Sequence, residues 1–99
     1  MRIEYERSGG FAGMHFTTTV ETAALPHAEA VKWHELVEQA KFFELPAMIP
    51  APTPGIDRFV YKLLIDDRGL QHTVEVGEAA LPESLRPLIE QLQKLARRA

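Results

Sequence analysis

The sequence contains no cysteine, so the chain can form neither disulfide bridges nor metal sites built from thiolates. This lack of cysteine fits a reducing compartment. Serine is also scarce, since Ser8 and Ser84 are the only two, and nucleophilic catalysis therefore has few candidate residues. These absences argue against a secreted disulfide scaffold and give no support to a serine or cysteine hydrolase.

Long hydrophobic runs are absent as well. No apolar stretch approaches the roughly 20 residues that a membrane-spanning helix needs. The first ten residues, MRIEYERSGG, hold no apolar core of a secretory signal, so we expect a protein that is not exported. The formal net charge of -3 gives no general attraction to nucleic acid or to anionic lipid, and we expect neither as a partner.

What the sequence does contain is the composition of an ordinary globular domain. Of the 99 residues, 45% are hydrophobic and 25% are charged, and a chain of this length can bury one real core. No low-complexity tail or long flexible linker divides it. We therefore expect a single domain that covers residues 1–99.

Four segments alternate between apolar and polar residues, which is the pattern of half-buried β-strands. They span residues 2–7, 14–20, 57–66 and 70–76. The glycine-rich sequence SGGFAG joins the first pair, and the turn sequence DDRG joins the second pair, with Asp66 and Asp67 as turn residues. The sequence therefore predicts two β-hairpins.

Two segments have the apolar spacing of amphipathic helices. The first opens at Leu25-Pro26 and ends before Pro46, and the second follows Ser84, its predicted N-cap. Residues 46–55, PAMIPAPTPG, hold four prolines and predict a stiff loop without a regular element. The order ββαββα predicts an α+β fold, a four-stranded antiparallel sheet with two main helices packed on one face.

Several patterns suggest chemistry, and each has a simpler structural interpretation. The loop SGGFAG runs from strand to strand, whereas phosphate-binding glycine loops lead into a helix. HELVE, residues 34–38, differs by one residue from the zinc motif HExxH, and a solvated face with a weak His34–Glu38 pair explains it better. The four histidines fall on different segments. His15 and His72 could meet across the sheet, although the alternation places His72 on the face with Leu70 and Val74. We expect no catalytic residue, no cofactor and no metal.

Two predicted loops carry apolar residues at positions where they need not be buried. Phe11 stands between glycines, and Met48 and Ile49 stand between prolines. One such residue on a surface needs no explanation, whereas two apolar-tipped loops suggest a docking edge. The same side chains could instead fold back over the core, and the sequence leaves both interpretations open.

Taken together, the motifs resemble the emfourin family over essentially the whole chain. They are ERSGGFAG after the first strand, FFELPA closing the first helix, APTPGIDRFVYKLLI, HTVEVGE and LRPLI. His27 departs from the acidic or proline residue more typical at that helix start. The resemblance implies a small bacterial protein inhibitor of thermolysin-like (M4) metalloproteases such as protealysin, commonly encoded beside its protease. It implies a cytoplasmic protein that is not an enzyme, with a protease as partner and no small-molecule substrate.

The resemblance also suggests how such an inhibitor acts. A thermolysin-like cleft holds a zinc ion and a deep apolar pocket, so we expect Phe11 to enter the pocket and residues 48–54 to line the rim. The candidate partner-binding residues are Gly9, Gly10, Phe11, Ala12, Met48, Ile49, Pro50, Pro52 and Pro54. Two alternatives remain, namely an interaction module or homo-oligomer that uses an exposed sheet edge, and an enzyme with a histidine-based site.

Overall fold

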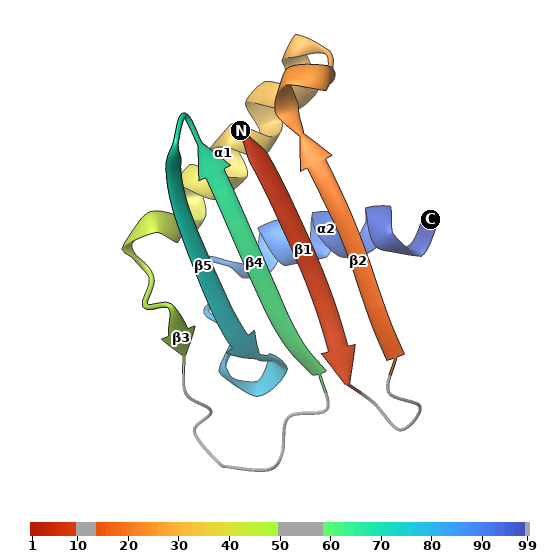
Figure 1. Ribbon diagram of the computed structural model, residues 1–99, viewed down its shortest axis with the longest axis vertical. Coiled ribbons are helices and arrows are strands. Elements are labelled where there is room, and N and C mark those ends of the chain that lie inside the picture. Colours follow the sequence, from red (N-terminus) through yellow and green to blue (C-terminus); the bar gives the residue numbers. More distant parts are fainter. Residues whose placement is uncertain (10–13, 50–58, 99) are drawn as a thin grey trace.

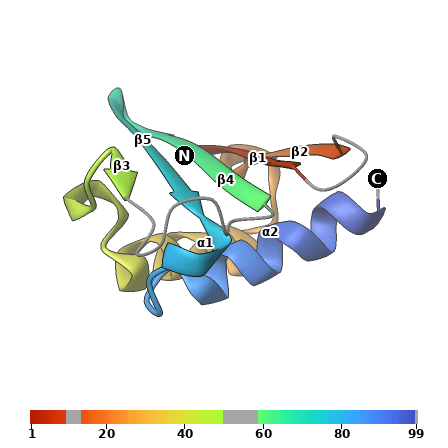
Figure 2. The same ribbon diagram turned by 90° about the horizontal axis from the view of Figure 1, so that it is seen from below.

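The chain folds into two layers, a five-stranded sheet and two α-helices that cover one of its faces (Figures 1 and 2). The computed structural model describes residues 1–9, 14–49 and 59–98. Its strands are β1 (Arg2–Gly9), β2 (Met14–Glu21), β3 (Met48–Ile49), β4 (Phe59–Asp67) and β5 (Leu70–Gly77). Its α-helices are α1 (His27–Ala40) and α2 (Arg86–Arg98), and its 3₁₀ helices are η1 (Thr22–Ala24), η2 (Phe42–Glu44) and η3 (Glu78–Ala80).

The predicted α+β class and the helices on one face are confirmed (Figure 2). The strand order β2-β1-β4-β5-β3 corrects the predicted sheet, and the additional strand β3 corrects the predicted order ββαββα. The sheet is mixed and has five strands, because Met48 and Ile49 of β3 pair in parallel with β5. Residues 46–55 were expected to hold no regular element, and that expectation was wrong at these two positions. Proline cannot donate a ladder hydrogen bond, so the strand is confined to the two residues between Pro46-Ala47 and Pro50.

The face of the sheet toward the helices carries the core. Side chains directly opposite each other on neighbouring strands point to the same face. The register pairs Ile3 with both Val20 and Ile65, and it pairs Tyr5 with Leu63. The buried hydrophobic residues are Ile3, Tyr5, Val20, Tyr61, Leu63, Ile65, Val74 and Val76 from the sheet, and Val37, Ala40, Phe42, Leu85, Leu88, Ile89 and Leu92 from the helical layer. The predicted apolar faces of the strands and helices therefore meet in one core.

The first helix ends earlier than its sequence predicted. Lys41 adopts a left-handed conformation with φ of 51°, and its N–H donates to the carbonyls of Val37 and Glu38. The chain therefore leaves the α-helix at Ala40, and the 3₁₀ helix η2 turns Phe42 into the core. The predicted N-cap Ser84 instead donates its hydroxyl to the carbonyl of Ala40 at 3.4 Å, and α2 begins at Arg86.

The turn between β4 and β5 has two central residues, Arg68 and Gly69, with φ of 55° and 85°. Two positive φ angles are the pattern of a type I′ hairpin turn. Asp66 and Asp67, predicted as turn residues, are the last two residues of β4 instead. Asp66 still supports the turn, because its Oδ1 accepts the N–H of Gly69 at 3.1 Å. Glycine suits its position, whereas arginine at Arg68 pays the steric cost of a left-handed conformation.

Replacing Arg68 with asparagine is expected to stabilise the protein by about 0.5 kcal/mol, because asparagine tolerates the left-handed region and Asn-Gly is favoured in type I′ turns. Urea unfolding of the two proteins measures the difference. Gly69→Ala serves as the opposite control and should lower the free energy of unfolding by about 1 kcal/mol. A lower stability of Arg68→Asn would contradict this account of the turn.

Candidate functional site

Both candidate docking loops start and finish at one end of the sheet. The register places Gly9, the last residue of β1, opposite Met14 on one side and Phe59 on the other. Figure 1 shows that β3 ends, and β4 starts, at this same end. We call it the loop end and define it by Gly9, Met14, Ile49 and Phe59. The fold thus brings together two segments that lie some forty positions apart in the sequence.

Three of the predicted partner-binding residues lie in the described part of the chain. Gly9 has a φ of 121°, a value that favours glycine over any other residue. The side chain of Met48 is 66% exposed, whereas Ile49 is half-buried and packs against the core. Ile49 therefore already has a structural role, and Met48 is the freer contact. Gly10, Phe11, Ala12, Pro50, Pro52 and Pro54 lie outside the described residues and stay predictions.

A residue that sequence reasoning missed lies close to the loop end. One row of side chains crosses all five strands on the helix-facing side, and it comprises Ile49, Val76, Tyr61, Arg7 and Phe16. Arg7 is the one charged member of this row. The signal was present, because Arg7 continues the Ile3, Tyr5 alternation of β1 and so had to face the helices.

Aromatic rings enclose the guanidinium of Arg7. Its Cζ atom lies 4.8 Å from the ring centroid of Phe16 and 4.8 Å from that of Phe59. Both distances fall within the range of cation–π attraction. Within the described residues, no carboxylate forms an ion pair with Arg7, and its buried Nε atom has no hydrogen-bond partner. The faces of the two rings therefore contribute to stabilising this charge.

The helical layer is fixed to the same row through Tyr61. Gln93 of α2 donates its side-chain N–H to the hydroxyl of Tyr61 at 3.2 Å. The Tyr61 ring stacks on that of Tyr5 with centroids 6.3 Å apart and an interplanar angle of 24°. These contacts join α2 to the strands that lead to the loop end.

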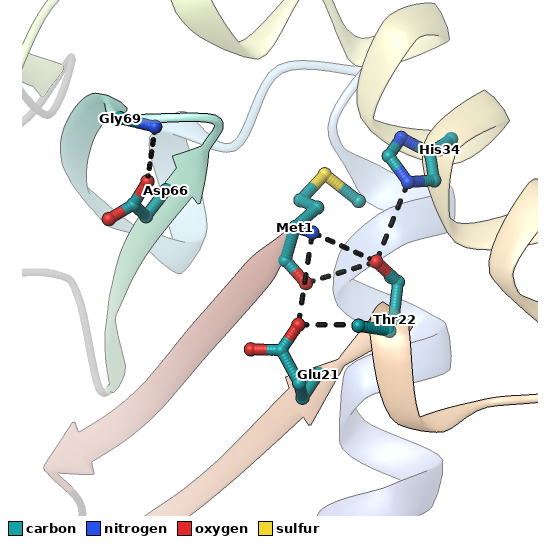
Figure 3. A network of polar contacts seen from close by, with 7 residues as sticks. Met1, Glu21, Thr22, His34, Asp66 and Gly69 are labelled. Carbon is teal, nitrogen blue, oxygen red and sulfur yellow. Dashed lines mark hydrogen bonds and ion pairs between the residues drawn. The ribbon is translucent and has the colours of Figure 1, made fainter.

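A polar network around buried Thr22 lies at the N-terminal end of β1, opposite the loop end (Figure 3). The backbone N–H of Thr22 donates to the carbonyl of Met1 at 2.9 Å, and its hydroxyl donates to the same oxygen at 3.1 Å. His34 Nε2 lies 3.5 Å from that hydroxyl. The predicted His34–Glu38 pair is therefore not observed, and His34 joins α1 to the end of the sheet instead.

The histidines do not assemble a site. His15 is exposed on the open face of the sheet, with Nε2 3.1 Å from Glu6 Oε1. His72 lies on the helix-facing side, as the alternation with Val74 indicates, and its Nε2 is 2.6 Å from the carbonyl of Leu45, so the two histidines do not meet across the sheet. Across residues 1–9, 14–49 and 59–98, no three His, Asp or Glu side chains gather as metal ligands would.

None of the helices described in residues 1–9, 14–49 and 59–98 has the length and the apolar composition of a membrane span.

Comparison with known protein families gives one match. The model of the Emfourin family matches residues 5–93, which include the loop end, the row of side chains that contains Arg7, all of α1 and the first part of α2. The comparisons with curated proteins and with solved structures found no match.

Proposed function

Because the chain belongs to the Emfourin family, a family of protease inhibitors, we propose that it inhibits thermolysin-like (M4) zinc metalloproteases. The family match over residues 5–93 carries this proposal. Under this proposal, the protein is not an enzyme, needs no cofactor and has a protease as its partner. Cytoplasmic residence, which the family resemblance implies, belongs to the same proposal.

The loop end is the surface that we propose to enter the active-site cleft. Phe11 would anchor the first loop in the apolar pocket, and Met48 to Pro54 would line the rim and block access of substrate. The convergence of both loop roots at one end of the sheet supports this arrangement, as does the 66% exposure of Met48. Prolines lower the conformational entropy that is lost on docking, and a peptide bond beside proline is a poor protease substrate.

Titration with a thermolysin-like protease tests the proposal. We expect residual protease activity to fall in proportion to the added protein and to reach its minimum at a fixed molar ratio, because a folded inhibitor acts by stoichiometric binding. An enzyme that inactivated the protease would instead work at substoichiometric amounts. Full protease activity in the presence of a large molar excess of the protein would refute the proposal.

A second candidate function follows from the edges of the sheet. Strand β2 has eight residues, lies at one edge and contains neither proline nor lysine, the residues that commonly protect edges. The opposite edge strand, β3, has two residues and offers little to pair with. An interaction module or homo-oligomer would therefore use β2. Light scattering of the protein alone and mixed with the protease separates the candidates, since a monomer that forms a one-to-one complex excludes the oligomer.

A further inference from the structure

Arg7 occupies a position that the fold would ordinarily give to an apolar residue. It is half-buried on the helix-facing side of the sheet, in the same alternation as Ile3 and Tyr5. Replacing a buried charge by a hydrophobic residue is often neutral or stabilising, so stability alone gives little reason for an arginine here. An arginine at this position therefore calls for a role that depends on its planar cation, which leucine and methionine lack.

The two rings that enclose Arg7 belong to the roots of the two candidate loops. Phe16 is the third residue of β2, which begins directly after the first loop. Phe59 is the first residue of β4, which begins directly after the second loop. Arg7 itself lies two residues before Gly9, where the first loop starts. Arg7 on β1 therefore contacts β2, which follows the first loop, and β4, which follows the second loop. Strand β1 lies between these two strands in the sheet.

We propose that Arg7 is a positioning residue, which holds the roots of the two loops in fixed relation through its contacts with Phe16 and Phe59. A guanidinium has two flat faces and can pack against a ring on each, whereas an aliphatic chain has no such directional preference. The two loop roots therefore keep one relative position when the protein meets a protease, and less conformational freedom of these roots is lost on docking. This inference rests on the proposed function for its effect on affinity, but its structural part can be measured on the free protein.

The test compares Arg7→Met with wild type, because methionine keeps an unbranched apolar stem and removes the planar cation. We expect the inhibition constant for a thermolysin-like protease to rise about tenfold while the melting temperature changes little. In the free protein, NMR should show faster hydrogen exchange or altered shifts at the backbone amides of Gly9, Met14 and Phe59. Arg7→Lys, which keeps the charge without the planar faces, should restore only part of the inhibition.

Arg2→Met is the matched control. It removes the same charge from the same strand, but Arg2 is 57% exposed and lies on the open face, where it forms an ion pair with Glu4 at 3.7 Å. This variant should inhibit like wild type, and if it weakens inhibition as much as Arg7→Met, long-range attraction rather than positioning explains the effect.

A double-mutant cycle with Phe59→Leu completes the test. If Arg7 acts through the ring, the two substitutions together should weaken inhibition by much less than the product of their separate effects. The inference would be overturned if the two substitutions had independent effects on inhibition. It would also be overturned if Arg7→Met left both inhibition and the backbone amides of the loop roots unchanged. In either case the proposed inhibitor function would still stand. If wild type itself does not inhibit, the proposed function fails, and the NMR comparison still decides whether Arg7 fixes the loop roots.

Discussion

Replacing Phe11 with alanine is expected to raise the inhibition constant for a thermolysin-like protease tenfold or more, with a nearly unchanged thermal melt. A central aromatic anchor contributes about 2 kcal/mol or more to binding, and each 1.4 kcal/mol corresponds to about a factor of ten in affinity. In the sequence, Phe11 stands between Gly10 and Ala12 and is the one large apolar residue of SGGFAG. Progress curves of protease inhibition measure the effect, and differential scanning calorimetry measures the melt.

Leu70→Ala provides the control for Phe11. Leu70 is also an exposed apolar residue, 59% exposed, but it follows the β4–β5 turn at the opposite end of the sheet from the loop end. Its truncation should leave inhibition unchanged. Unchanged inhibition by Phe11→Ala would place the anchor elsewhere, and a sharp fall of the melting temperature would show that Phe11 packs into the protein's own core.

Replacing Phe42 with alanine is expected to lower the free energy of unfolding by about 3–5 kcal/mol, because truncation of an enclosed phenylalanine leaves a cavity. Phe42 has no exposed surface, and its ring centroid lies 5.6 Å from that of Phe43 and 5.4 Å from that of His72. A domain of this size is stable by about 5–15 kcal/mol, so this one change removes a large part of the total. Urea unfolding followed by circular dichroism measures the loss.

Phe43→Ala is the natural comparison for that change. Phe43 is half-buried at the margin of the core, so its truncation should cost clearly less than that of Phe42. A loss below about 1 kcal/mol for Phe42→Ala would contradict the role of η2 as the element that carries a core residue between α1 and β3.

Periodicity in the sequence was enough to predict the four long strands, both helices and the faces that they bury. The alternation of residues 57–66 with period two allowed only one face for Tyr61, Leu63 and Ile65, and all three are buried. The helical spacing around Leu88 and Leu92 was equally clear, and both residues are enclosed. Such patterns succeed because each follows from the geometry of its own element, without reference to the rest of the chain.

Prediction from the sequence failed where a partner distant in the chain decided the outcome. Strand β3 exists because Glu75 donates its backbone N–H to the carbonyl of Ala47 at 2.9 Å, and the prolines around it gave no local sign of a strand. His34 was expected to contact Glu38 one turn away, yet it lies beside Thr22 at the end of the sheet. In both cases long-range contacts outweigh the local preference.

For the candidate site, the sequence by itself determined which segments carry unusual residues, namely a glycine-rich turn with Phe11 and a proline-rich loop with Met48 and Ile49. Only the tertiary structure decided that both segments start from one end of the sheet, and that Arg7 contacts a ring beside each. Strand order and register are set by contacts between distant residues, and no local period encodes them. The same alternation that buries Ile3 and Tyr5 placed Arg7 among apolar side chains, but its meaning depended on Phe16 and Phe59 being its neighbours.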